Sequence, residues 1–252
     1  MAQGDISPAF TLLFMEKNVK YPRRYARLEA IEAIGREGVE KLRNGKVFII
    51  GCGALGSLCA MYLAASGVGT IGLADFDTID ATNLQRQLFY TEDSVGASKI
   101  EQLAERLLSL NSETTLRLHK EMITPAKAER IFPDYDFIID GSDHPSTKLM
   151  TSRVCESLGV PYCIGGVESF SGQVMSWSPG HTGYKELFGE IAACSELLPC
   201  SIAGVAGPAA GVVASYQASE AIKFLTSAGT MLYDRLHTFD LLTTASDTLI
   251  LG

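Results

Sequence analysis

A short, wholly apolar segment, Val47–Ile50, runs directly into the glycine-rich sequence Gly51-Cys52-Gly53-Ala54-Leu55-Gly56. Such a run is typical of a buried parallel strand, and the small residues from about 55 to 66 predict a helix after the turn. Glycine allows a tight turn and a close approach of the backbone to a phosphate, while a helix N-terminus supplies N–H donors and a positive dipole. The spacing therefore indicates a nucleotide-binding unit. A glycine turn that only packs a helix on a strand is the alternative.

Strand and helix patterns alternate after this turn. Further strands are expected at four apolar segments with helices between them: Thr70–Ala74, Thr115–His119, Phe137–Ile139 and Pro161–Ile164. This alternation predicts an α/β fold of the Rossmann-like kind, with a mostly parallel sheet covered by helices on both faces. The later segments Ser171–Trp177, Arg235–Asp240 and Thr248–Leu251 are expected to close the sheet as antiparallel C-terminal strands.

The chain is expected to fold as one main domain with a short extension. Residues 1–45 form an N-terminal helical extension, because apolar residues recur at helical spacing from Ala26 to Leu42. Residues 46–252 form a single nucleotide-binding domain. Within it, residues from about 178 to 204 read as a mobile loop, and Val205–Thr226 reads as a helix.

Composition narrows the classes of function. The 252 residues are 46% hydrophobic and 20% charged, as in a soluble globular protein, and the net charge is −8. An acidic balance argues against stable nucleic-acid binding, which needs a basic surface. The apolar windows are interrupted by Gly, Pro or polar residues, so no membrane span is expected, and no signal peptide is apparent. Six scattered cysteines fit a reducing cytoplasm.

Polar residues gather in the segment after the second expected strand. Asp75 ends that strand, where a carboxylate can accept hydrogen bonds from ribose hydroxyls, and Asp77 follows two residues later. The same stretch carries Asn83, Arg86 and Lys99. Cations beside the glycine turn suit a triphosphate, because they offset its charge and stabilise a departing pyrophosphate. Each of these charges taken alone could equally be a solvated surface group.

Several motifs together resemble the ThiF/MoeB/HesA family, bacterial relatives of ubiquitin-activating enzymes. The most specific is Asn83-Leu84-Gln85-Arg86-Gln87, with Gly51–Gly56 upstream and Gly96-Ala97-Ser98-Lys99 downstream. The resemblance extends from about Tyr21 to Asp240. Further matches are Arg24-Tyr25-Ala26-Arg27, Asp140-Gly141-Ser142-Asp143 and Ser219-Glu220-Ala221-Ile222-Lys223.

The resemblance implies an adenylyltransferase. Such an enzyme uses ATP and Mg²⁺ to adenylate the C-terminal glycine carboxylate of a ubiquitin-like sulfur-carrier protein, in thiamine, molybdopterin or related biosynthesis. A terminal carboxylate is already ionised at pH 7, with a pKa of about 3.5, so it needs no general base to attack phosphorus. Catalysis then requires charge neutralisation and in-line positioning, which Arg, Lys, Asn and a metal-binding Asp can supply.

The family implies a role for each matched residue. Asp75 would hold the ribose beside Asp77, and the nucleotide would lie on Gly51, Gly53, Ala54 and Gly56. Asn83, Arg86 and Lys99 would contact the phosphates. Asp143 would bind Mg²⁺, with a helix N-cap as the alternative. Arg27 would reach into the ATP site of a second copy, which implies a homodimer; a solvated helix charge is the alternative.

The sequence departs from the family at the zinc-binding cysteines. Many relatives carry two Cys-x-x-Cys pairs, but no cysteine stands near Gly183–Glu186 and none follows Cys200, so no zinc is expected. Cys200 matches a family cysteine that forms a thioester or persulfide link with the activated carrier; a buried structural thiol is the alternative. Cys194 is a weaker candidate for that role.

Three other functions remain open at this point. A relative could adenylate a small carboxylate, such as one on a modified tRNA base, although the acidic charge disfavours tRNA. An NAD(P)-dependent oxidoreductase would explain the glycine turn and Asp75, but it leaves Arg86, Lys99 and Asp143 without a common purpose. A catalytically inactive partner-binding module would not require the intact polar set.

Overall fold

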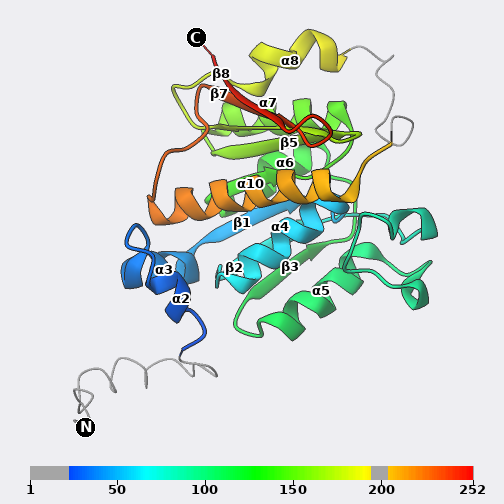
Figure 1. Ribbon diagram of the computed structural model, residues 1–252. Helices are drawn as coiled ribbons and strands as arrows, with labels where there is room; N and C mark the ends of the chain where they lie inside the picture. The colour runs from blue at the N-terminus through cyan, green and yellow to red at the C-terminus, as the bar shows by residue number, and fades with distance from the viewer. Residues whose placement is uncertain (1–22, 194–203, 252) are drawn as a thin grey trace.

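One mixed β-sheet forms the centre of the molecule (Figure 1). The computed structural model describes residues 23–193 and 204–251. Within them, eight strands lie in the order β3-β2-β1-β4-β5-β6-β7-β8. Five pair in parallel: β1 (Lys46–Ile50), β2 (Thr70–Ala74), β3 (Thr115–His119), β4 (Phe137–Asp140) and β5 (Tyr162–Glu168). Three continue the sheet antiparallel: β6 (Ser171–Trp177), β7 (Arg235–Asp240) and β8 (Ala245–Ile250).

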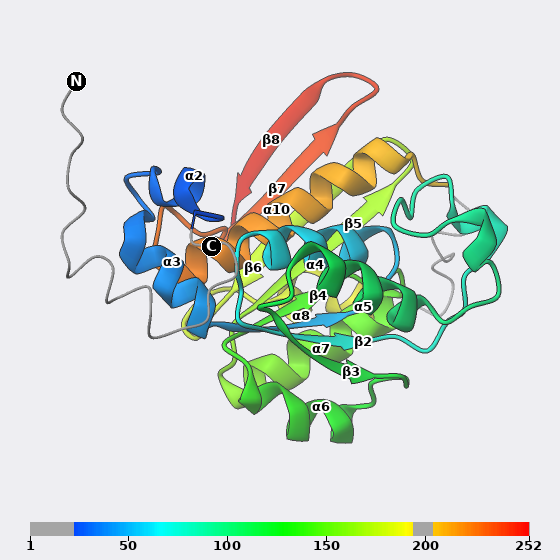
Figure 2. The same cartoon turned by 90° about the horizontal axis from the view of Figure 1, so that it is seen from below.

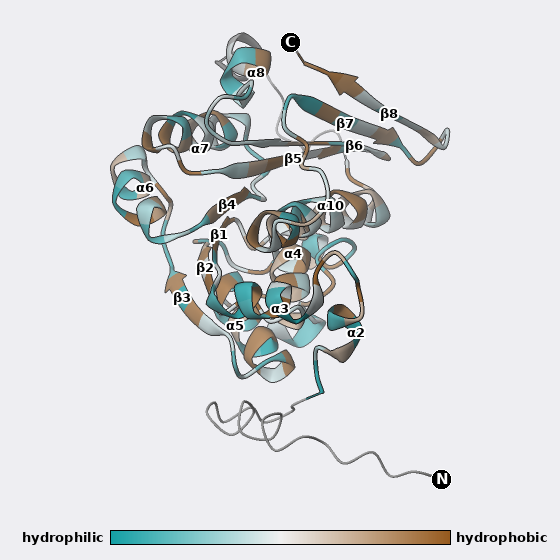
Figure 3. Ribbon diagram, turned by 90° about the vertical axis from the view of Figure 1, so that its left-hand side faces the viewer, coloured by the Kyte–Doolittle hydropathy of each residue, from teal (hydrophilic) through white to brown (hydrophobic). Residues whose placement is uncertain are grey.

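Helices cover both faces of the sheet (Figure 2 and Figure 3). One layer holds α3 (Gly35–Asn44), α4 (Ala54–Ala65), α5 (Lys99–Leu110) and α10 (Gly207–Thr226). The other layer holds α6 (Pro125–Ile131), α7 (Pro145–Leu158) and α8 (Tyr184–Ala193). Short helices complete the described chain: α2 (Ala26–Glu29), η1 (Ala81–Asn83), η2 (Glu92–Ser94) and η3 (Phe132–Asp134).

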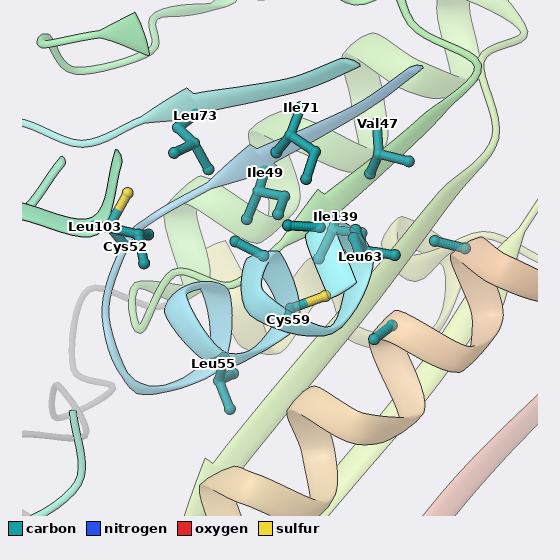
Figure 4. Close-up of a cluster of buried hydrophobic side chains, with 14 of the residues drawn as sticks. Val47, Ile49, Cys52, Leu55, Cys59, Leu63, Ile71, Leu73, Leu103 and Ile139 are labelled. Atoms are coloured by element: carbon teal, nitrogen blue, oxygen red, sulfur yellow. The ribbon is translucent and has the colours of Figure 1, made fainter. Parts of the chain in front are cut away.

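Alternation along β1 divides the core into two clusters. Side chains on a strand point to opposite faces in turn. Ile49 packs with Leu63 of α4, and Figure 4 shows these side chains beside Cys59 and Ile139. Phe48 instead joins the cluster beneath α6 and α7. Because both faces of β1 are buried, its sequence is a continuous apolar run and not an alternating one.

The predicted α/β class, with its parallel sheet and antiparallel C-terminal strands, is confirmed. Two local predictions were wrong. The expected continuous helix from Ala26 to Leu42 is broken, because α3 restarts at Gly35, whose φ of +58° lies in the left-handed region. The expected loop at about 178–204 contains α8, whose Leu187 and Phe188 pack against the core beneath α7.

The sheet topology creates a binding position. The crossover from β1 leads outward to β2 and β3, whereas β4 and β5 lie on the other side of β1. Ligands of doubly wound folds bind where the strand order reverses, outside the carboxyl ends of the strands. Here that place lies between β1 and β4. No helix in the described part of the chain is both long and apolar enough to cross a bilayer.

Candidate nucleotide site

A cavity of about 450 Å³ lies at the carboxyl ends of β1, β2 and β4. It occupies the place where the strand order reverses. Most of the residues predicted from the sequence line it: Gly51, Gly53, Ala54, Asp75, Asp77, Arg86, Lys99 and Asp143. Residues up to 92 positions apart in the sequence are therefore brought to one site, as expected for chemistry that involves all of them.

The glycine turn fits tightly between β1 and α4. Gly51 has a φ of +88°, which favours glycine, and a side chain on Gly56 would overlap the carbonyl oxygen of Gly51. Gly56 is buried and is not among the lining residues, so it allows close helix packing. α4 begins after Gly53, which offers no side-chain cap to the first-turn amides. Uncapped amides at a helix N-terminus form a favourable site for an anion.

Asp75 fastens the end of β2 to this turn. Its Oδ2 accepts a hydrogen bond from the Cys52 amide at 2.6 Å, and its Oδ1 accepts one from the Asp77 amide at 2.7 Å. Burial raises the pKa of Asp75, although these bonds and the nearby Lys99 favour the charged form. A carboxylate held so rigidly at the cavity wall is placed to accept further hydrogen bonds from a ligand.

Lys99 lies buried at the cavity and is tied to Asp77. Its Nζ approaches Asp77 Oδ2 at 2.9 Å, and its amide donates to the carbonyl oxygen of Asp77 at 3.1 Å. The hydroxyl of Tyr90 donates to the carbonyl oxygens of Cys52, at 2.6 Å, and of Lys99, at 3.3 Å. Tyr90 thereby links the glycine turn to the start of α5, a connection that the sequence did not reveal.

Arg86 and Asn83 come from one turn but occupy different places. Arg86 lines the cavity, and its Nη1 donates to the carbonyl oxygen of Thr82 at 3.1 Å. Asn83 is not among the lining residues. Its Oδ1 accepts a hydrogen bond from the Asp80 amide at 3.2 Å, which stabilises η1 and so positions Arg86. A phosphate contact by Asn83 stays a prediction.

Gln87 is a lining residue that sequence reasoning did not select. Its side chain is 4% exposed and lies beside Gly53. Its Oε1 has no hydrogen-bond partner within the described residues. A buried polar atom at a cavity wall requires a partner, and a bound ligand can supply one. The sequence signal that could have identified Gln87 as a site residue is its position next to Arg86, at the end of the segment from Asn83 to Gln87.

Asp143 follows β4 and stands over the cavity. The N-cap position of α7 is held by His144, so the expected alternative of Asp143 as the N-cap is wrong. No group of three or more His, Cys, Asp or Glu side chains within the described ranges is placed to hold a metal. A magnesium ion could still fit beside Asp143, since Mg²⁺ commonly takes one carboxylate and completes its shell with substrate phosphates and water.

A second cavity of about 460 Å³ adjoins the first. The two share four lining residues: Asp143, Lys148, Gly166 and Val167. Strands β5, β6 and β7 and helix α8 supply the other walls. Three glycines of β5 and β6, Gly165, Gly166 and Gly172, are among its lining residues. A second reactant can therefore approach a ligand in the first cavity directly.

Arg27 is not among the residues that line the cavity. Arg27 is exposed on α2, which Figure 1 shows beside α3, at the opposite end of the strands from the loops that follow β1 and β2. The neighbouring Arg24 donates to the carbonyl oxygen of Leu110, at the end of α5 away from Lys99. A role for Arg27 in a second copy stays a prediction. Cys200 and Cys194 lie outside the described residues.

Comparisons with known proteins give consistent matches over most of the chain. The model of the family described as "ThiF family" matches residues 25–251. The adenylyltransferase and sulfurtransferase uba4 of Emericella nidulans is 40% identical over 216 residues, 82% of this chain and 45% of that protein. The probable adenylyltransferase/sulfurtransferase MoeZ of Mycobacterium tuberculosis is 36% identical over 224 residues, 87% of this chain and 57% of that protein. The chain thus spans about half the length of these relatives.

Solved structures support the fold. The crystal structure of E. coli MccB with ATP superposes with a TM-score of 0.80 at 24% identity. That match covers 98% of this chain and 80% of the MccB chain. At this identity the likeness concerns the fold alone.

Proposed function

The chain belongs to the ThiF family, and we propose that it is an adenylyltransferase that uses ATP to activate the C-terminal glycine carboxylate of a ubiquitin-like sulfur-carrier protein. The observation that carries this proposal is the shared cavity of the glycine turn, Arg86, Lys99 and Asp143. An oxidoreductase site would have no common use for two cations and a metal-binding carboxylate beside the phosphate turn.

The geometry supports ATP as the nucleotide. The uncapped start of α4 would receive the phosphates, and Asp75 would accept hydrogen bonds from the ribose. The amide oxygen of Gln87 is buried and has no hydrogen-bond partner among the described residues, so it offers a further acceptor at the wall of the same cavity. Mg²⁺ beside Asp143, when bound, supplies charge neutralisation on the phosphate oxygens.

The reaction then follows from charge and position. The carrier's ionised carboxylate attacks the α-phosphorus, the bond to the bridging oxygen breaks, and pyrophosphate leaves with its electron pair. Arg86 and Lys99 stabilise the negative charge that develops on the leaving group. Lys99 is held ready for this role by Asp77, so little reorganisation is needed during the reaction.

The adjoining cavity offers a path for the carrier's C-terminus. A glycine tail is narrow and extended, and Gly165, Gly166 and Gly172 line the space that leads to Asp143. A carboxylate entering there would reach Asp143, which lines both cavities. This path supports a macromolecular tail as the second reactant, although a small carboxylate could also enter.

Isotope exchange between pyrophosphate and ATP tests the proposal. The assay is run with the protein alone and with a purified ubiquitin-like carrier that ends in Gly-Gly; a carrier lacking its last glycine serves as the matched control. Exchange that depends on the intact carrier is expected. Exchange driven only by a small carboxylate, or tight NAD(P) binding without exchange, would reject the proposal.

A further inference from the structure

Lys148 lies at the junction of the two cavities and has no role in the chemistry described above. It belongs to the first part of α7 and lines both spaces. Its side chain is 9% exposed, and the carboxylate it faces, Asp140, is fully buried. A buried charge pair is costly to assemble and needs further hydrogen bonds to be tolerated. Its presence beside a reaction site therefore calls for an explanation.

The pair is embedded in a set of bonds that all converge on one turn. Lys148 Nζ lies 3.1 Å from Asp140 Oδ1 and donates to the carbonyl oxygen of Ser142 at 2.6 Å. The amide and hydroxyl of Ser142 donate to the same Oδ1, at 3.0 and 2.6 Å. Thr151 Oγ1 donates to the other carboxylate oxygen at 2.8 Å. The ammonium thus closes a loop between the two ends of the segment Asp140–Ser142.

The backbone within this segment is also fixed by its neighbours. The backbone amide of Gly141 donates to the carbonyl oxygen of Ile50 at 2.9 Å, and the side-chain Nε2 of Gln217 donates to the carbonyl oxygen of Asp140 at 2.7 Å. Gly141 packs so closely on Gly56 that a Cβ would lie 2.8 Å from the Gly56 nitrogen. The residue that follows this rigid segment is Asp143.

We propose that Lys148 is a positioning residue that locks the Asp140–Ser142 turn and thereby presents Asp143 to the magnesium of a bound nucleotide. The inference rests on the proposed function for the identity of the nucleotide, but not on the carrier. Lys148 acts through Asp143 and not on the substrate, so its effect appears specifically in the contribution of Mg²⁺ to nucleotide binding.

The test measures the affinity of a fluorescent ATP analogue in EDTA and in MgCl₂, without any carrier. The dissociation constant in EDTA divided by that in MgCl₂ gives the magnesium increment, which is the factor by which Mg²⁺ strengthens nucleotide binding. The central variant is Asp140→Asn/Lys148→Met, which removes both members of the buried pair and leaves no unpaired charge. We expect its affinity in EDTA to stay near that of the wild type, while the magnesium increment falls by about tenfold or more, as when metal-ligand supports are removed.

Matched variants separate positioning from mere folding. Lys148→Arg retains a buried cation and should keep most of the increment. Thr151→Val removes one hydrogen bond to Asp140 without introducing a charge, so it should fold and lose the increment by about twofold to fivefold. In an Asp143→Asn background, the Asp140→Asn/Lys148→Met change should have no further effect on the increment. Lys41→Met on the exposed face of α3 is the remote control.

The outcomes divide clearly. A wild-type magnesium increment in the folded double variant, or in Thr151→Val if the double variant does not fold, overturns the proposal. A further loss in the Asp143→Asn background also overturns it, because Lys148 would then act independently of Asp143. Absence of carrier-dependent exchange in the wild type would reject the proposed function while leaving this binding test intact.

Discussion

The carboxylate of Asp75 accepts a hydrogen bond from the backbone amide of Cys52 at 2.6 Å, and this bond joins the ends of two neighbouring strands beneath the nucleotide cavity. Cys52 lies in the centre of the glycine turn, so Asp75 both shapes the turn and lines the site. The same side chain therefore contributes to stability and to binding. Substitution of Asp75 should therefore change both the stability of the fold and ligand binding, and the change in stability should depend on pH.

Replacing Asp75 with Asn should destabilise the fold by about 1–3 kcal/mol at pH 7. The Asn side chain has only one acceptor oxygen, so its NH₂ group would face one of the two backbone N–H groups, of Cys52 and Asp77, that now donate to the carboxylate. Burial raises the pKa of Asp75 in the folded state above its unfolded value. The folded wild type therefore takes up a proton at a higher pH than the unfolded chain.

The wild type should accordingly gain stability relative to Asp75→Asn as pH falls from 7, with the full gain present below the unfolded pKa of about 3.9. Urea unfolding of both proteins across this range measures the difference, and other titrating groups cancel in the comparison. A difference that narrows as pH falls would contradict the assigned direction of the pKa shift.

Gly56→Ala should disrupt the nucleotide site, because the added methyl would overlap the carbonyl oxygen of Gly51. We expect a loss of about 2 kcal/mol or more in unfolding free energy and a loss of nucleotide binding. Gly211→Ala in α10 is the matched control, since the nearest atom to its Cβ would be 3.8 Å away. The control should be neutral or slightly stabilising. Thermal unfolding and ATP-analogue titration follow both variants; equal behaviour would show that Gly56 is not needed for close packing.

Lys99→Met should weaken ATP binding about tenfold or more and change AMP binding little, because a charge-assisted bond to the outer phosphates is lost. Asp77→Asn should weaken ATP binding less, because it removes the carboxylate that holds the Lys99 ammonium but leaves the charge of Lys99 in place. Calorimetric titration with ATP and with AMP provides the comparison, and Lys41→Met serves as the exposed control. Equal losses for both nucleotides would place Lys99 away from the outer phosphates.

Mixing Arg27→Ala with Arg86→Ala tests whether the site needs a second copy. If Arg27 serves the partner's cavity, a mixed dimer contains one site with both arginines intact. An equimolar mixture after subunit exchange should then recover about one quarter of wild-type exchange activity, although each variant alone is inactive. No recovery in a mixture proven to contain mixed dimers would assign Arg27 to the site of its own chain, and an active Arg27→Ala variant would assign it to no site.

The sequence predicted the parallel strands well because each is a short apolar run bounded by turn residues, as at Thr70–Ala74. Gly51, Asp75 and Asp143 follow the ends of β1, β2 and β4, which the topology brings together, and all three line one cavity. The break between α2 and α3 was missed because apolar spacing continues across it, and only the backbone at Gly35 reveals the interruption. α8 was missed because its packing against the core is a tertiary contact.

The hydrogen bonds that support the site could not be predicted from the sequence. Tyr90 and Lys148 donate hydrogen bonds to partners that lie close only in the folded chain, and the burial of Gln87 at the cavity wall is evident only there. Asn83 was recognised from its motif, but the structure places its amide in the η1 turn and not at the cavity wall. Residue types indicate the chemistry available, whereas the contacts decide which residue performs it and which one holds another in place.

The most direct test of the account is a crystal structure with a non-hydrolysable ATP analogue and Mg²⁺. We predict the phosphates at the uncapped start of α4, with Arg86 and Lys99 within hydrogen-bond distance of phosphate oxygens and Asp143 on the magnesium ion. Phosphates bound away from Gly53, with these three side chains directed elsewhere, would contradict the central claim that they serve one triphosphate.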